Sequence, residues 1–302
     1  MPSASKVTQL IGNTPLLKLQ RLPAQNAATV LVKLESLNPG GSVKDRIAMA
    51  MVKTAERSGL LTSGGVIVEP TSGNIGIALA MVAAVRGYRC ILTMPETTPE
   101  SRRRLLAWFG AEVVLTPVAE GMAGAMRRAR DIAEDIPGAF MPRQFENPVN
   151  PEAHRQTTAQ EIWSATNGAV DAFVCGVGTG GTISGVADVI KNRNPKFEAI
   201  AVEPSESRVI AGGTHAPHGI DGIGMGFVPH NLDLDLIDGI EHVSSEEAFA
   251  MRDRLLREEG VLAGISSGAS VCAALRVAER LGGGKTVVTM IHDTGERYLS
   301  LS

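Results

Sequence analysis

Residues 38–46 read Asn38-Pro39-Gly40-Gly41-Ser42-Val43-Lys44-Asp45-Arg46, and the interpretation of the chain starts here. The proline and the two glycines predict a turn. Ser42 is typical of a helix N-cap, with Asp45 as the acidic member of a capping box. Apolar residues then recur every four positions, which predicts a helix to about Gly59. Lys44 is therefore expected in the first turn of a helix.

The first turn of a helix is an unfavourable place for the cation of Lys44. The helix dipole puts about half a positive charge there and disfavours the ammonium form by ~0.3–1 kcal/mol. A neutral, partly desolvated lysine amine is a nucleophile and can form a Schiff base with an aldehyde. The alternative is a surface lysine balanced by Asp45, so Lys44 alone leaves the question open.

Composition excludes several classes of function. The chain has 302 residues, enough for about two domains, and a formal net charge of −3 without a long basic run. Nucleic acid and anionic membrane are therefore improbable partners. The longest apolar stretch, Ile75–Val85, is too short to span a bilayer, and the N-terminus has no apolar core of signal-peptide length. Three distant cysteines without a C-x-x-C pair fit a reducing cytoplasm, and the scattered histidines give no metal-ligand spacing.

Strand and helix patterns alternate strictly from Val66 to Ala133, which is the mark of parallel βαβ units. Strand–helix patterns return after a proline-rich segment at 137–151, beginning with one helix expected over Glu152–Thr166. We therefore expect an α/β protein of two domains, each a mostly parallel twisted sheet flanked by helices. The larger domain would comprise 1–40 plus 149–302, and the smaller, mobile domain 41–148.

Three loops rich in small residues lie at helix starts: Gly40–Lys44, Thr71–Asn74 and Gly178–Thr182. Ligands of open parallel sheets bind outside the carboxyl ends of strands. Three glycines in Gly178–Thr182 let several N–H groups point at one spot before a helix, which predicts a phosphate cradle. Thr71–Asn74 offers hydroxyls and N–H groups suited to a carboxylate, and Gln144 is a further neutral donor.

A dinucleotide site is the competing hypothesis. Gly176, Gly178 and Gly181 fit G-x-G-x-x-G after a strand, and Glu203 closes the next strand as the ribose-binding acid. This reading leaves Lys44 and the other two loops without a purpose. Ser266 lies in Gly264-Ile265-Ser266-Ser267-Gly268, but this segment resembles a capped helix start, so a serine hydrolase is weakly supported.

Four segments carry a family resemblance, in this order along the chain: 39–46, 71–76, 178–182 and 264–268. They resemble the cysteine synthases, or O-acetylserine sulfhydrylases, of the pyridoxal phosphate enzymes. The similarity extends from Ile11 to Ser300. It implies the tryptophan synthase β-like fold (fold type II), with the cofactor in the cleft between two domains.

The resemblance also implies roles. Lys44 matches the Schiff-base lysine and general base, Asn74 the partner of the cofactor's ring oxygen, and Ser266 the residue facing the pyridine nitrogen. A serine there is neutral, which favours β-elimination over transamination. The other implied residues are Gly178, Thr179, Gly180, Gly181 and Thr182 for the phosphate, Thr71, Ser72, Gly73 and Gln144 for the substrate carboxylate, and Gly222 at the entrance.

The reaction implied is formation of L-cysteine from O-acetyl-L-serine and sulfide through an α-aminoacrylate. A cystathionine β-synthase-like or O-phosphoserine-using sibling remains open, although no arginine in 219–227 could receive a second phosphate. Asp221 stands where many members carry a neutral glutamine, which could weaken hydrosulfide binding. The family further implies a homodimer and a possible partner, the C-terminal tail of serine acetyltransferase. We expect neither an appended regulatory domain nor a haem-binding segment.

Overall fold

The computed structural model describes residues 3–299, and its packing divides the chain into two compact units. Unit 1 comprises the residues up to Ile11 and Lys44–Val149, and unit 2 comprises Gly12–Val43 and the residues from Asn150 onward. Residues 3–11 fall in the smaller unit, whereas the sequence placed them in the larger domain. The reason is that the short 3-10 helix Val7–Leu10 packs against helix α2 (Asn74–Arg86).

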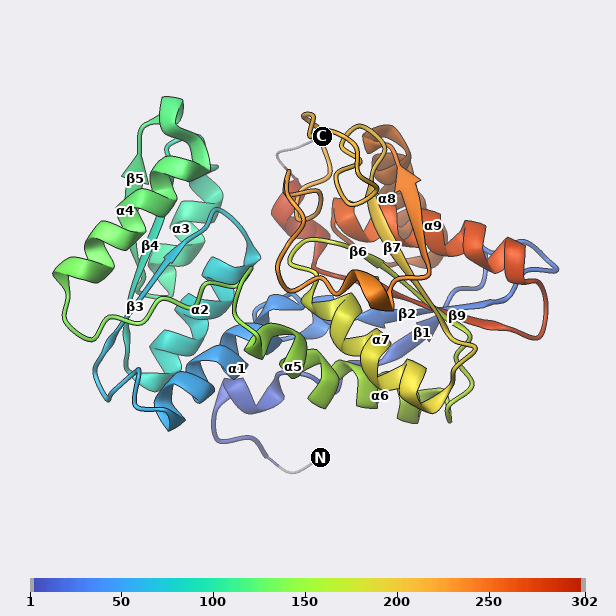
Figure 1. Ribbon diagram of the computed structural model, residues 1–302, viewed down its shortest axis with the longest axis horizontal. Helices are drawn as coiled ribbons and strands as arrows, with labels where there is room; N and C mark the ends of the chain where they lie inside the picture. Colours follow the sequence, from blue (N-terminus) through green and yellow to red (C-terminus); the bar gives the residue numbers. More distant parts are fainter. Residues whose placement is uncertain (1–2, 300–302) are drawn as a thin grey trace. The chain divides into compact units, whose positions relative to one another are not determined.

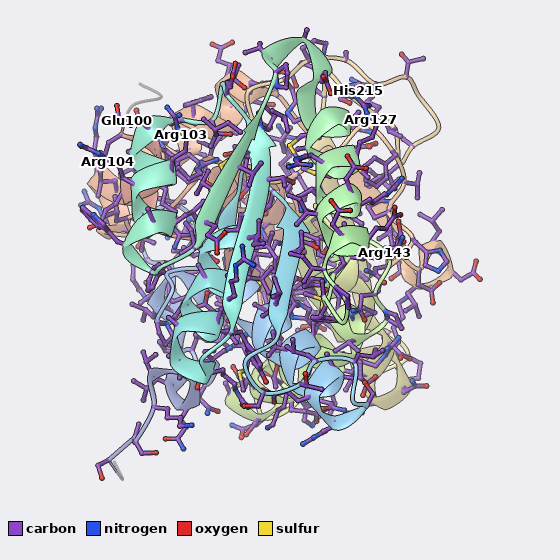
Figure 2. All side chains as sticks on the ribbon, turned by 90° about the vertical axis from the view of Figure 1, so that its left-hand side faces the viewer. Glu100, Arg103, Arg104, Arg127, Arg143 and His215 are labelled. Carbon is purple, nitrogen blue, oxygen red and sulfur yellow. The ribbon has the colours of Figure 1, made fainter. Side chains whose placement is uncertain are left out.

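Unit 1 is built on a three-stranded parallel sheet, in the order β3-β4-β5 (Figure 1). Its strands are β3 (Val66–Pro70), β4 (Arg89–Pro95) and β5 (Glu112–Thr116). Its helices, besides α2, are α1 (Lys44–Arg57), α3 (Glu100–Trp108) and α4 (Gly121–Asp135). Figure 2 shows α3 and α4 on opposite sides of this sheet. Each strand therefore points its carboxyl end toward a loop that leads into a covering helix.

The core of unit 1 explains its apolar sequence runs. On one face, Val68 and Ile91 pack against Ala129 and Ile132 of α4. Helix α2 is apolar all round because Ile75–Ala83 is buried on every side. Full burial of a large aliphatic side chain stabilises a fold by about 1.5–3 kcal/mol, so this run anchors the helix that follows the Thr71–Asn74 loop.

Unit 2 contains a six-stranded sheet in the order β1-β2-β9-β6-β7-β8. Only the β1–β2 pair among these strands is antiparallel. The strands are β1 (Leu16–Lys18), β2 (Thr29–Leu34), β6 (Ala172–Gly176), β7 (Glu198–Pro204), β8 (Gly239–Val243) and β9 (Thr286–Ile291). The helices are α5 (Val149–Gln156, its first residue in unit 1), α6 (Thr158–Ala165), α7 (Gly181–Arg193), α8 (Ser245–Glu259) and α9 (Ile265–Leu281). One core joins the sheet to α8 and α9, and another joins it to α6 and α7 (Figure 1).

The predicted α/β fold with parallel sheets flanked by helices is confirmed, two local predictions are wrong and one strand was missed. Ser42 is not the residue that precedes α1, because it forms a β-bridge with Asp293 and the helix begins at Lys44. The helix expected over Glu152–Thr166 is broken at Thr157, whose hydroxyl donates to the Ala153 carbonyl at 2.6 Å. Strand β8 was not predicted. Within residues 3–299, no helix combines the length and apolar character needed to cross a membrane.

Candidate active site

Lys44 is the first residue of α1 and therefore lies in the first turn of a helix, as predicted. Its side chain is half-buried, and the next two residues, Asp45 and Arg46, are buried. The segment just before it is fixed in unit 2, where the Val43 N–H donates to the His292 carbonyl at 2.8 Å. Helix α1 packs on α2 within unit 1. The lysine thus sits at a helix N-terminus, the position where the dipole favours a neutral amine.

The Thr71–Asn74 loop joins β3 to α2 and is held by short local bonds. The Thr71 N–H donates to the Thr93 carbonyl at 2.9 Å, and the Thr71 hydroxyl accepts the Gly73 N–H at 3.0 Å. From α3, Arg102 donates to the Ser72 carbonyl at 2.6 Å, while Arg104 of the same helix lies on its outer side (Figure 2). The loop therefore presents N–H groups at the start of a 13-residue helix, an arrangement that suits a carboxylate.

Gln144 lies beside the end of strand β3 in unit 1, although the two are far apart in sequence. Residues 140–144 run alongside β3, since the Val68 N–H donates to the Phe140 carbonyl at 2.9 Å. The backbone then turns at Arg143, whose φ is +54°, and Gln144 is buried. Its N–H donates to the carboxylate of Glu69 at 3.3 Å. Sequence reasoning missed Glu69, because nothing local marks a strand carboxylate as the partner of a distant turn.

The Gly178–Thr182 loop connects β6 to α7 in unit 2. A β-carbon built on Gly178 would lie 2.4 Å from the Gly222 carbonyl oxygen, and one on Gly181 would lie 2.0 Å from Asn150 Oδ1. Gly180 has a φ of +80°. These three positions require glycine. The backbone of the loop therefore packs directly against its neighbours at these positions, with no side chain in between.

The same loop has the donors that a phosphate needs. The first N–H groups of α7 have no intrahelical partner, and the positive end of its dipole favours an anion. Thr179 is buried, and its hydroxyl accepts a hydrogen bond from Asn150 Nδ2 at 3.0 Å. Thr182 Oγ1 lies 3.1 Å from His154 Nε2. The N–H groups and hydroxyls of this segment fit the phosphate of pyridoxal phosphate.

Ser266 lies in the first turn of α9 and is 4% exposed. A β-carbon on Gly222, which has a φ of +95°, would lie 3.7 Å from Ser266 Oγ. Because Gly222 also adjoins Gly178, unit 2 brings three predicted site residues together. The segment His218–Met225, which includes Gly222, lines a cavity of about 280 Å³.

A buried hydrogen-bond network, which was not predicted from the sequence, holds the backbone carbonyl of Ser266. Ser270 donates to the Ser266 carbonyl at 3.0 Å and accepts the Gly176 N–H at 3.0 Å. With that proton committed, His292 Nε2, 2.9 Å away, is left to donate to Ser270 Oγ. The i, i+4 spacing of the two serines on α9 was the available signal.

Glu203 does not have the freedom that a dinucleotide site needs. It is buried, and its carboxylate accepts the N–H groups of Ile210 at 2.8 Å and Ala211 at 3.1 Å. His242 Nε2 lies 3.2 Å from the same group. The carboxylate therefore serves the fold, which contradicts its assignment to a ribose.

The cysteines and the metal-ligating side chains form no second centre. Cys90 and Cys175 are buried, and Cys272 is half-buried. Burial raises the pKa of the Cys90 thiol to about 12, so it is a poor nucleophile. Across the described part of the chain, no group of three His, Cys, Asp or Glu side chains could hold a metal ion.

Comparison with known families decides the class. The model of the family described as "Pyridoxal-phosphate dependent enzyme" matches residues 7–293. The chain belongs to this family. The predicted cofactor is thereby confirmed, and the dinucleotide hypothesis is wrong.

Similar proteins of this pyridoxal-phosphate dependent family include cysteine synthases and a related synthase. A cysteine synthase of Staphylococcus aureus (strain Mu50 / ATCC 700699) is 52% identical over 295 residues, 97% of this chain and 95% of the relative. The crystal structure of an O-ureido-L-serine synthase is 45% identical, with a TM-score of 0.96 over 99% of this chain and 94% of that one. A cysteine synthase from Entamoeba histolytica is 40% identical, with a TM-score of 0.94 over 99% and 90% of the two chains. The predicted family resemblance is confirmed.

Proposed function

We propose that this chain is a cysteine synthase that exchanges the acetate of O-acetyl-L-serine for sulfide and releases L-cysteine. The observation that carries the proposal is the 52% identity to a cysteine synthase over nearly the whole length of both chains. Features within each unit support it, because unit 1 contains the Lys44 amine and hydrogen-bond donors suited to a carboxylate, and unit 2 contains donors suited to a phosphate. The C–O bond to acetate breaks, a C–S bond forms at the same carbon, and the Cα proton is removed and later returned.

The residues divide this work by their chemistry. Lys44 Nζ would hold the cofactor covalently and, once released, take the proton from the substrate Cα. Gly178–Thr182 would bind the phosphate, and Asn74 the ring oxygen. When bound, pyridoxal phosphate supplies an electron-accepting ring that stabilises the charge left at Cα. Ser266, a neutral hydroxyl, would face the ring nitrogen without keeping it protonated.

The substrate carboxylate would be held by Thr71, Ser72, Gly73 and Gln144 in unit 1. Neutral donors bind a carboxylate without a counter-charge, and the start of α2 adds its dipole. Gly222 would line the entrance. The expected movement of the smaller domain would exclude water during turnover.

Borohydride reduction of the purified holoenzyme, followed by peptide mass spectrometry, tests the role of Lys44. We expect the cofactor on Lys44, and loss of both adduct and turnover in Lys44→Ala. Lys53→Ala is the matched control, since Lys53 is an exposed lysine of the same helix. An adduct on a different lysine, or normal turnover by Lys44→Ala, would contradict the assignment.

The choice of activated serine has a second candidate. The alternative is a cystathionine β-synthase-like or O-phosphoserine-using activity, and the fold is shared with a synthase of a different product, O-ureido-L-serine. Asp221 is exposed on the loop that lines the cavity and disfavours a dianionic phosphate ester there. Steady-state kinetics with O-acetylserine and O-phosphoserine decide the matter, and a higher kcat/KM for O-phosphoserine would overturn our choice.

The family resemblance also supports three proposals about the protein in the cell. We propose a cytoplasmic homodimer that binds the C-terminal tail of serine acetyltransferase at the active site. Light scattering should give the mass of a dimer, and a tail peptide should compete with O-acetylserine. A monomer mass would refute the homodimer, and absence of competition at high peptide concentration would refute binding of the tail.

A further inference from the structure

Glu69 is a buried carboxylate that the proposed chemistry does not use. It is the fourth residue of β3 and is 2% exposed. Its Oε2 accepts the N–H of Arg143 at 3.1 Å, and its Oε1 accepts the N–H of Gln144 at 3.3 Å. One carboxylate therefore accepts hydrogen bonds from two consecutive peptide groups. The turn that they form includes Arg143, whose φ of +54° is unusual for a residue other than glycine.

The position of this carboxylate links two parts of the candidate carboxylate subsite. Glu69 precedes the Thr71–Asn74 loop by two residues, and Gln144 belongs to the turn that it holds. The backbone pairing of β3 with the distant segment reaches Phe140, whose N–H donates to the Val66 carbonyl at 2.8 Å. Beyond Phe140, the side chain of Glu69 continues the connection as far as Gln144.

Few charged groups face Glu69. In the turn that Glu69 holds, these are Arg143 and Glu146, whose side chains are both more than half exposed. Arg143 Nη1 lies 3.8 Å from Glu146 Oε2. The Arg143 guanidinium lies at the outer edge of the unit in Figure 2. Strand β4 contributes the buried thiol of Cys90, helix α2 has no ionisable side chain before Arg86, and the buried residues of α4 are glycine, alanine and isoleucine.

Burial of this carboxylate disfavours its charge. Desolvation raises the pKa of Glu69 to about 7, although the two N–H donors oppose the rise. Both forms are therefore populated near neutral pH. The ionised form can accept both N–H groups, whereas the protonated form has one oxygen committed as a donor.

We propose that Glu69 is a positioning residue for amino-acid binding, and that its ionised carboxylate holds the Gln144 turn in the conformation that receives the substrate α-carboxylate. The inference rests on the proposed function, because it needs Gln144 to contact an amino acid. The residue acts through Gln144 and does not itself touch the substrate.

The test measures binding of L-serine, which carries the α-carboxylate but lacks a good leaving group, to the holoenzyme through the cofactor absorbance. Glu69→Gln keeps the shape but offers one acceptor oxygen. A buried backbone donor left unsatisfied costs about one hydrogen bond, so we expect a Kd raised roughly tenfold at pH 8. Cofactor retention and the KM for sulfide should not change. As the pH falls to 6, the ratio of the variant's Kd to the wild-type Kd should fall toward one, because protonation of the L-serine amine affects both proteins equally.

Glu146→Gln is the matched control, because it removes a carboxylate from the same turn without touching either N–H group. It should bind L-serine as the wild type does. Hydrogen exchange of residues 140–147 without substrate should be faster in Glu69→Gln, and its effect on Kd should disappear in a Gln144→Ala background. If Glu69→Gln does not fold, Glu69→Asp, which keeps the charge but is one methylene shorter, takes its place.

The outcomes separate this inference from the proposed function. Wild-type protein that responds to neither L-serine nor O-acetylserine would refute the proposed function and this inference with it. A responsive wild type with an unchanged Kd in Glu69→Gln would overturn the inference alone, even if exchange becomes faster. Tighter binding by Glu69→Gln would mean that the charge repels the substrate, which also overturns it.

Discussion

Substitution of Glu69 by Gln should make unit 1 more stable at alkaline pH while leaving it unchanged in acid. The pKa of Glu69 rises from its ordinary value of 4.5 to about 7 in the folded protein because the carboxylate is fully buried. A folded-state pKa above the unfolded one means that ionisation is penalised in the folded protein. The penalty is absent below about pH 4.5, grows between the two pKa values and is complete above pH 7.

The size of this effect follows from the same two pKa values. At about 1.4 kcal/mol per pKa unit, ionised Glu69 destabilises the folded state by about 3 kcal/mol. Glutamine imitates the protonated acid and carries no such penalty. Glu69→Gln should therefore match the wild type at pH 4.5 and exceed its free energy of unfolding by about 3 kcal/mol at pH 8.

Urea unfolding followed by circular dichroism measures the stability, and hydrogen exchange of peptides from β3 reports on unit 1 alone. Glu146→Gln, at the exposed end of the same turn, should change the free energy of unfolding by less than about 0.5 kcal/mol at either pH. An equal difference between Glu69→Gln and the wild type at pH 4.5 and pH 8 would refute the reasoning from burial.

Three further substitutions test other parts of the structure. Gly178→Ala places a methyl group 2.4 Å from the Gly222 carbonyl, so cofactor affinity, measured by fluorescence titration, should fall roughly tenfold or more. Lys33→Met removes a buried ammonium that lies 2.7 Å from the partly exposed Glu161, and urea unfolding should show a loss of about 3 kcal/mol; a loss below 1 kcal/mol would refute a stabilising role for this ammonium. Ser244→Ala deletes the cap of α8 and should cost about 1 kcal/mol in the same assay, with no change in kcat.

The parallel sheets and the helix starts were predictable because they leave local marks. Three segments combine turn residues with a following helical pattern of apolar residues, and the structure has a helix start at each of them, as predicted. These segments are Lys44, Thr71–Asn74 and Gly178–Thr182. Glycine spacing predicted the cradle but not its neighbours. Residue 181 must be glycine because a β-carbon there would clash with Asn150, which is distant in sequence.

Apart from the helix break at Thr157, the features that the sequence missed share one physical cause, which is pairing with partners distant in sequence. Ser42 has the chemistry of an N-cap, yet its backbone pairs with Asp293 instead. Strand β8 is a half-buried edge strand without a long apolar run, so its existence depends on β7. Glu69 and Ser270 act across 74 and 94 residues of sequence, and no local pattern encodes such pairings.

The burial of the cysteines has a consequence for a protein that handles sulfide. Sulfide oxidises to polysulfides, which convert reactive thiolates to persulfides, and susceptibility follows thiolate character and exposure. Cys90 and Cys175 are buried, and desolvation raises the pKa of Cys90 and of the half-buried Cys272. The chain therefore disfavours the reactive thiolate form of Cys90 and Cys272 and keeps Cys90 and Cys175 away from the oxidised by-products of the reagent that we propose it consumes.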